Sequence, residues 1–141
     1  MTERLVRISK NDAAAILHTA AAHYPAECCG LLEGTATSDG WRVVAVHEAP
    51  NIAPDPRRRF LIDPQHQFEL LRRLRGTDRE LIGCFHSHPD GPPQPSATDL
   101  AQAIEPDFVW LIASGTPASF ELHAYLFNGA TFAPLHLVQS S

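Results

Sequence analysis

Apolar positions recur along this chain in two spacings, one of which predicts helices and the other strands. From residue 9 to about residue 23 they fall three or four positions apart, as on the buried face of a helix. Ser9 is a typical N-cap for this helix, and Pro25 cannot continue it. Residues 63 to 75 open with Asp-Pro, an N-cap and first-turn pair, and predict a second helix. A third helix is predicted from residue 96 to about residue 104.

Shorter apolar runs, bounded by glycine, proline and small polar residues, predict strands. These runs cover residues 28–32, 41–46, 81–85, 108–113, 120–127 and 132–138. The first two are expected to form a hairpin, with Gly34 and the Ser-Asp-Gly cluster at 38–40 as its turn. Proline-rich stretches at 51–59 and 89–95 predict loops. The resulting order predicts an α/β fold in which helices pack on a mixed sheet.

Length and composition predict one globular domain over residues 1–141. The chain is 44% hydrophobic and 19% charged, as ordinary folded domains are. It holds no apolar run of about 18 residues, so we expect no membrane span. The apolar stretch 13–22 follows several basic residues, as in a signal peptide, but His18 and Thr19 interrupt it. We therefore expect this stretch to be part of the first helix.

The cysteines indicate a reducing compartment. Cys28, Cys29 and Cys84 are an odd number, and adjacent cysteines do not readily form an unstrained disulfide bond. We therefore expect a cytoplasmic protein. All three are interpreted as small, buried apolar side chains rather than as nucleophiles or metal ligands.

Charge is distributed unevenly along the chain. The net charge of −5 argues against general nucleic-acid binding. Residues 57–79, however, hold seven of the eleven basic residues and three acids, a local excess of +4. We interpret this segment as a solvated surface, and a docking surface for a partner, centred on Arg57 to Arg59, is the alternative.

The clearest chemical signal is the sequence HSHP at residues 86–89, followed by SATD at residues 96–99. On a strand, residues two apart project to the same face, so His86 and His88 can aim their ring nitrogens at one point. Asp99 can be the third ligand. Two imidazoles and a carboxylate would leave the fourth tetrahedral position of a zinc ion open for water, as in catalytic sites. The other histidines lack such spacing, and we expect none of them to bind metal.

Ser96 and Asp99 also match a capping box, so the start of a helix alone would explain both residues. Their combination with the histidine pair favours a metal site, because an N3 carboxylate points back toward the helix start. Asp99 cannot fully serve both roles. We therefore expect its carboxylate on the metal and the Ser96 hydroxyl free for another role.

Catalysis by such a centre needs a base that takes the proton from the attacking water. Glu27 is a candidate because it lies at the edge of an apolar strand, where a carboxylate is not needed for solubility. Spacing alone does not distinguish Glu27 from Glu33, Glu48 or Glu80.

The motifs YPAECCGLL at 24–32, HSHP at 86–89 and SATD at 96–99 resemble those of the JAMM/MPN+ metalloprotease family. The family pattern is a distant Glu, then His-Xaa-His-Pro, and then a Ser and an Asp at fixed distances. All five positions are present here. NIA at 51–53 and RFLIDP at 59–64 also resemble the short bacterial branch, so the resemblance covers nearly the whole chain.

The resemblance implies a zinc peptidase or isopeptidase of cytidine-deaminase-like α/β architecture. It implies one Zn²⁺ per chain, held by His86, His88 and Asp99. Glu27 would be the general base and then the proton donor to the leaving amine, and Ser96 would donate a hydrogen bond to the oxyanion. Deaminase activity is not expected, because the His-Xaa-Glu and Pro-Cys-Xaa-Xaa-Cys signature of zinc deaminases is missing.

Compact bacterial members of this family are associated with ubiquitin-like sulfur-carrier proteins that end in GlyGly. By this resemblance we expect cleavage of an amide bond after the GlyGly of such a carrier, whose tail would add a strand beside a sheet edge. Two alternatives stay open: a non-catalytic MPN-type scaffold or binding module, and a zinc peptidase that acts on small peptides. The identity of the carrier and the oligomeric state are left open by the sequence.

Overall fold

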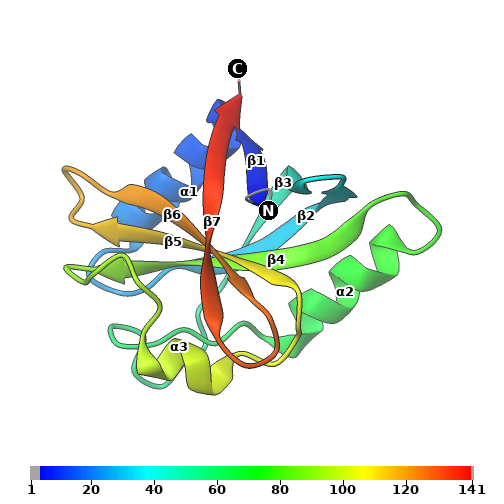
Figure 1. Ribbon diagram of the computed structural model, residues 1–141. Coiled ribbons are helices and arrows are strands. Elements are labelled where there is room, and N and C mark those ends of the chain that lie inside the picture. The colour runs from blue at the N-terminus through cyan, green and yellow to red at the C-terminus, as the bar shows by residue number, and fades with distance from the viewer. Residues whose placement is uncertain (1–3, 141) are drawn as a thin grey trace.

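Seven strands and three helices lie within residues 4–140, the part of the chain that the computed structural model describes (Figure 1). The strands are β1 (Leu5–Ser9), β2 (Cys29–Thr37), β3 (Gly40–Ala49), β4 (Glu80–Pro89), β5 (Phe108–Gly115), β6 (Glu121–Phe127) and β7 (Phe132–Ser140). The helices are α1 (Lys10–His23), α2 (Pro64–Leu74) and α3 (Ala97–Gln102). None of these helices is long and apolar enough to cross a membrane.

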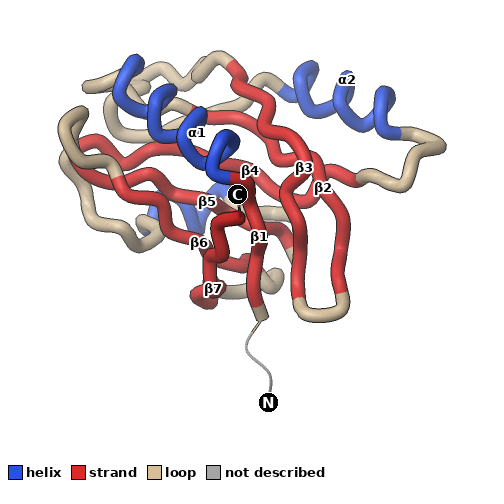
Figure 2. The backbone as a smooth tube through the Cα atoms, turned by 90° about the horizontal axis from the view of Figure 1, so that it is seen from above, coloured by secondary structure: helices blue, strands red, loops and turns tan. Residues whose placement is uncertain are grey.

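The strands form one mixed sheet that closes on itself in the order β1-β3-β2-β4-β5-β6-β7. β1 pairs in parallel with β3 and with β7, and β4 pairs in parallel with β5. The remaining pairs are antiparallel. α1 lies on one side of β4, β5 and β6 and α3 on the other, while α2 packs against β4 (Figures 1 and 2). The predicted α/β fold with helices on a mixed sheet is confirmed.

The main core lies between α1 and the sheet. α1 buries Ala13, Ile16 and Ala20 in one stripe, as the apolar spacing predicts, and β1 adds Val6 and Ile8. Burying an aliphatic side chain as large as Ile contributes about 1.5–3 kcal/mol. This packing anchors α1, from whose end the chain leads directly to Glu27.

The predicted helix starts are confirmed by their caps. The Ser9 hydroxyl accepts a hydrogen bond from the backbone N–H of Asp12 (3.0 Å), and the Asp63 carboxylate accepts one from Gln65 (3.0 Å). Each cap satisfies an N–H group that has no partner inside its helix. α2 and α3 both end slightly earlier than predicted.

The apolar pattern did not predict β1, so the element order gains one strand at its start. Buried Val6 and Ile8 alternate with Arg7, which is a strand pattern, but five residues beside a helix start form a short window. β1 approaches β3 closely at Gly40, where a Cβ atom would lie 1.8 Å from the carbonyl oxygen of Leu5. Only glycine permits this approach.

The turn of the β2–β3 hairpin is shorter than predicted. The assignment of Gly34 to the turn was wrong, because β2 continues through it to Thr37. Gly34 lies at a register shift next to Glu33, and a Cβ atom there would lie 2.1 Å from the carbonyl oxygen of Arg42. This glycine therefore serves a bulge inside the sheet rather than a turn.

Candidate metal centre

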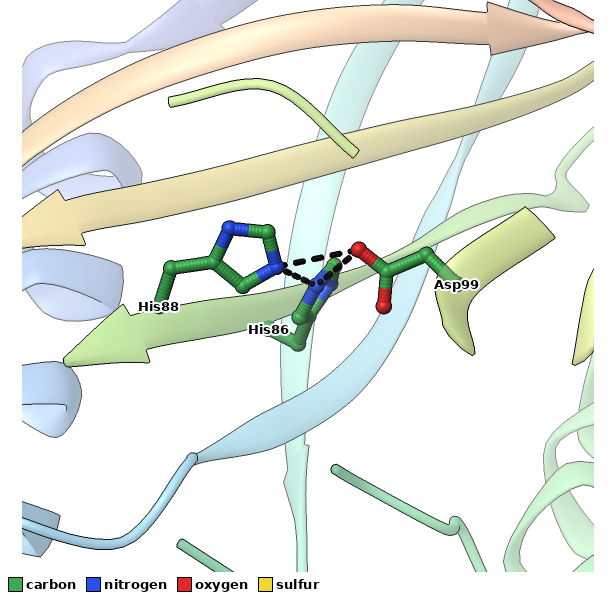
Figure 3. A group of neighbouring side chains, drawn as sticks. All are labelled: His86, His88 and Asp99. Carbon is green, nitrogen blue, oxygen red and sulfur yellow. Dashed lines mark hydrogen bonds and ion pairs between the residues drawn. The ribbon is translucent and has the colours of Figure 1, made fainter. Parts of the chain in front are cut away.

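β4 and α3 bring together the three predicted metal ligands. His86 and His88 project from the same face of β4, and both rings point toward the Asp99 carboxylate in the first turn of α3 (Figure 3). The two Nε2 atoms lie 2.9 Å apart. Asp99 Oδ2 lies 3.2 Å from Nε2 of His86 and 3.0 Å from Nε2 of His88. All three side chains are buried.

This triangle fits a metal ion by its size and by the chemistry of its atoms. Zinc bonds of about 2.0–2.1 Å place tetrahedral ligand atoms about 3.3 Å apart, close to the separations found here. The His88 Nδ1–H donates to the carbonyl oxygen of Pro92 (2.9 Å), which leaves the Nε2 lone pair turned toward the Asp99 carboxylate. Two electron-rich atoms aimed at one point repel each other unless a cation lies between them. The residues therefore fit a bound divalent metal.

Charges and burial shift the titration of the ligand group in different directions. Burial lowers the pKa of His86, which Asp99 only partly offsets. Burial also acts to lower the pKa of His88, but the neighbouring Asp99 outweighs it and the pKa is raised. For Asp99, burial acts to raise the pKa, yet the close contacts with the His86 and His88 rings outweigh it and hold the pKa well below its usual range. The carboxylate is thus anionic, as a metal ligand must be.

Ser96 and Asp99 form the capping box that their spacing matches, and Asp99 also faces the two histidines, so the expected division of roles between them stays a prediction. The capping box is complete, because the Ser96 hydroxyl accepts from the Asp99 N–H (3.0 Å) and Asp99 Oδ2 accepts from the Ser96 N–H (2.9 Å). A carboxylate oxygen has two lone pairs, so Oδ2 can face the histidines and cap the helix together. The Ser96 oxygen is an acceptor in the cap, and its own proton stays available for donation.

Glu27 lies next to the ligand group, in the segment that leads into β2. Ser87, between the two histidines, accepts a hydrogen bond from the Cys28 N–H at its Oγ atom (2.8 Å), and its own N–H donates to the Cys28 carbonyl (3.2 Å). Cys29 pairs with His86 in an antiparallel register, and two further residues in that register bring Glu27 opposite His88. Glu27 is buried, and its Oε1 atom has no hydrogen-bond partner.

Burial dominates the titration of Glu27. It raises the pKa of this carboxyl group to about 8, while the nearby His88 acts to lower it and Asp99 acts to raise it. A carboxyl group with a pKa near neutrality, beside a candidate metal centre, has the properties of a general base.

The other glutamates that the sequence could not exclude lie in different surroundings. Glu33 is also buried, but it accepts hydrogen bonds from His47 (2.8 Å) and Arg79 (3.0 Å). Glu48 and Glu80 are exposed. Of the four, Glu27 alone combines burial with a carboxyl oxygen that has no partner.

The interpretation of the cysteines is confirmed as far as burial is concerned. Cys28, Cys29 and Cys84 are all buried and unbonded to one another. Burial raises the pKa of the Cys28 thiol to about 11, which keeps it in its unreactive form. None of the histidines outside β4 joins the ligand group of the described residues.

Two aromatic residues that sequence reasoning missed pack around His86. Phe60 stacks on its ring with centroids 4.4 Å apart, and Trp110 meets the ring edge-on at 5.6 Å. Both side chains also line a largely apolar cleft of about 430 Å³ between α2 and α3, with Ile62 and Ile104. Phe60 follows a proline-rich loop, so no local pattern marks it as part of the site.

The closed mixed sheet and the convergence of His86, His88 and Asp99 define an α/β domain with a side-chain group that could hold a metal ion. Residues 9–127 match the prokaryotic homologues of the JAB domain. The chain therefore belongs to this family.

Relatives and solved structures agree with this assignment. A desampylase from Haloferax volcanii is 40% identical over 95 residues, which are 67% of this chain and 67% of that protein. The CysO-cysteine peptidase of Mycobacterium tuberculosis is 30% identical over 119 residues, 82% of this chain and 80% of that protein. The chain is thus an enzyme of the peptidase class.

The fold is that of JAB1/MPN domains. A protein from Desulfitobacterium hafniense superposes with a TM-score of 0.86 at 28% identity, covering 97% of this chain and 94% of that one. A JAB1/MPN domain protein from Archaeoglobus fulgidus gives 0.60 at 20% identity, with 95% and 98% covered. The predicted family and architecture are confirmed.

Proposed function

We propose that residues 1–141 act as one zinc-dependent peptidase or isopeptidase domain. Its reaction is hydrolysis of the amide bond after the C-terminal GlyGly of a ubiquitin-like or sulfur-carrier protein. The observation that carries the proposal is the convergence of His86, His88 and Asp99 beside Glu27, a buried carboxyl group with an unpartnered oxygen. The named activities of the desampylase and of the CysO-cysteine peptidase support this substrate class.

His86, His88 and Asp99 would hold one zinc ion. When bound, zinc supplies a Lewis acid that makes water a stronger acid and polarises the scissile carbonyl. Three protein ligands leave room for water and substrate, which distinguishes a catalytic from a structural site. In the form that binds metal, both imidazoles are neutral and Asp99 is anionic, so the ligand group carries a net charge of −1, which favours a divalent cation.

Glu27 and Ser96 carry the remaining steps. The Glu27 carboxylate accepts a proton from the attacking water and delivers it to the leaving amine nitrogen, so that C–N cleavage releases a neutral amine. The Ser96 hydroxyl donates a hydrogen bond to the oxygen on which negative charge develops. Because Ser96 caps α3, its hydroxyl is held in place before substrate binds.

The apolar cleft between α2 and α3 is the proposed binding site for the carrier tail. The expected addition of the tail as a strand at a sheet edge stays a prediction, because β1 pairs with only the first three residues of β3 and leaves the rest of that edge without a strand neighbour within residues 4–140. The cleft reaches His86 through Phe60 and Trp110. Buried free thiols support the cytoplasmic location that this substrate class implies.

Metal analysis of purified protein tests the centre. We expect about one zinc per chain in the parent and almost none in the His88→Ala and Asp99→Ala variants. His136→Ala is the matched control, because His136 is exposed on β7 and should leave the zinc content unchanged.

Cleavage assays then separate the proposed function from its alternatives. The probes are CysO extended at its C-terminus by cysteine, and other GlyGly-ended carriers fused to a short peptide. The parent should release the carrier, and Glu27→Gln should bind zinc without releasing it. Zinc binding with cleavage of small peptides only would make the protein a small-peptide peptidase. The absence of zinc after reconstitution, together with no cleavage, would make it a scaffold.

A further inference from the structure

One amide side chain, that of Asn51, joins five backbone groups beside the candidate centre. Asn51 follows β3 after a single proline. Its Nδ2 atom donates to the carbonyl oxygens of Glu27 (3.0 Å), Arg59 (3.0 Å) and Pro56 (3.5 Å), and its Oδ1 atom accepts from the N–H groups of Ala53 (3.0 Å) and Leu61 (3.0 Å). The two shorter donor bonds use both amide protons, and both lone pairs of Oδ1 are occupied.

The segment that Asn51 organises, residues 51–62, touches both the proposed base and a proposed ligand. The Glu27 N–H donates to the Pro56 carbonyl (2.8 Å), so both backbone polar groups of Glu27 are bonded to this segment. Phe60, from the same segment, stacks on His86. A bridge between Asn51 and Ile62 closes the segment at its base.

We propose that Asn51 is a positioning residue for Glu27. It fixes the backbone of Glu27 to the 51–62 segment, and thereby sets where the carboxyl group stands relative to His86 and His88. The role in turnover rests on the proposed function. The positioning itself concerns only the backbone around Glu27.

The surroundings of Glu27 explain why such a device is needed. Its Oε1 atom makes no hydrogen bond, so no side-chain contact of that oxygen holds the carboxyl group in place. Its position therefore depends on its backbone, and the Asn51 amide and the Pro56 carbonyl are the two groups that bond it. A proton-transfer group displaced by about 1 Å can lose about 10²-fold in rate.

Asparagine suits this position because it donates and accepts from one planar group. Asn51→Asp keeps the shape and the acceptor bonds to Ala53 and Leu61, but it removes both donor protons and leaves the Glu27 and Arg59 carbonyls unpaired. Asn51→Ala removes all five bonds. Asn128 offers a matched control, because its Oδ1 accepts from the N–H groups of Ala130 and Thr131 (2.9 Å each) in the β6–β7 turn.

The first test is independent of turnover. Amide hydrogen exchange is measured on the parent, Asn51→Asp, Asn51→Ala and Asn128→Ala, all in the zinc-free form. We expect the Glu27 amide to exchange at least about tenfold faster in both Asn51 variants and to be unchanged in Asn128→Ala. Unchanged exchange at Glu27 in Asn51→Asp would overturn the proposal, whether or not the parent has activity.

The second test asks whether Asn51 acts through Glu27. On a cleavable carrier fusion, Asn51→Asp should lower kcat by about 10-fold to 100-fold, with zinc content unchanged and KM altered by less than about threefold. In a double-mutant cycle, adding Asn51→Asp to Glu27→Gln should lower kcat little further than Glu27→Gln alone. If the two substitutions lowered kcat independently, so that their fold-reductions multiplied in the double variant, action through Glu27 would be refuted. A parent that cleaves no carrier would refute the proposed function instead, and exchange would still decide the positioning role.

Discussion

Replacing Glu27 by glutamine should strongly reduce turnover. It should also stabilise the metal-free protein against unfolding, and this gain relative to the parent should be larger at neutral pH than at acid pH. Glutamine has nearly the same shape as glutamate and never ionises. The parent must bury a carboxylate whose Oε1 atom lacks a partner. Turnover should fall by about 10²-fold to 10⁴-fold, the usual contribution of a general base.

The magnitude follows from the pKa of Glu27, which burial raises from the ordinary value of 4.5 to about 8. A raised carboxyl pKa means that the folded protein holds its proton longer than the unfolded chain does. Stability is therefore intact below about pH 4.5 and declines as the pH rises toward about 8. At about pH 7.5 the linkage relation gives a cost of about 4 kcal/mol, and water that screens the site reduces our expectation to about 2 kcal/mol.

Urea unfolding of zinc-free protein at about pH 5 and pH 7.5, followed by fluorescence of the buried Trp41 and Trp110, measures this cost. The quantity of interest is the change, between the two pH values, in the stability difference between Glu27→Gln and the parent. A constant cost of packing the amide cancels in that comparison. The difference should move in favour of Glu27→Gln by about 1.5 kcal/mol as the pH rises, because a small part of the cost is already present at about pH 5.

Glu33→Gln is the matched control with the opposite sign. Burial acts to raise the pKa of Glu33, but hydrogen bonds from His47 and Arg79 outweigh it and lower the pKa. Its ionised form therefore contributes stability at neutral pH that is lost as the pH falls through the lowered pKa. Glu33→Gln should be destabilised at pH 7.5 and less so in acid. If both variants gave the same pH trend, or Glu27→Gln gave none, the electrostatic reasoning would be refuted.

Three further changes test other parts of the site. Ser96→Ala should cost about 1 kcal/mol of stability through the lost cap and about 10²-fold in kcat, and Ser96→Thr should restore the cap; a normal kcat in Ser96→Ala would remove the hydroxyl from the mechanism. Replacing Arg57 to Arg59 together by alanine should raise KM for a carrier fusion with little change in kcat, and an unchanged KM would remove them from substrate binding. Ser87→Ala should lower the free energy of unfolding by about 1–3 kcal/mol, measured in urea, because the buried Cys28 N–H loses its acceptor.

Local patterns were enough to predict that His86, His88 and Asp99 lie close together, whereas their role as metal ligands stays a prediction. The two-residue spacing of His86 and His88 has a direct meaning on a strand, and the capping box fixes where Asp99 points. Helix starts at Ser9 and Asp63 were predictable for the same reason, since a cap involves residues two or three apart. Features that depend only on residues a few positions apart in the chain could therefore be predicted from the sequence.

Contacts between distant segments could not be predicted in this way. Nothing near Glu27 in the sequence separates it from Glu33, whose partners His47 and Arg79 come from other elements. The bond from Asn51 to Glu27 depends on how the 51–62 segment folds against the residues before β2, and no periodic pattern records that fold. β1 was not predicted because five residues are too few to show a strand pattern on their own. Its strand conformation depends on pairing with β3 and β7.

Unpaired polar atoms in residues 4–140 gather at one place. Two buried side-chain atoms there lack a partner, Oε1 of Glu27 and Nδ1 of His86, and both belong to the candidate centre. Each such atom costs about 1–3 kcal/mol, and Glu33, equally buried, shows that this fold can pair a buried carboxylate fully. The chain therefore retains at Glu27 a cost that it avoids at Glu33. A carboxyl oxygen left without a partner can accept a proton from water, which Glu33, held by an imidazole and a guanidinium, cannot do as readily.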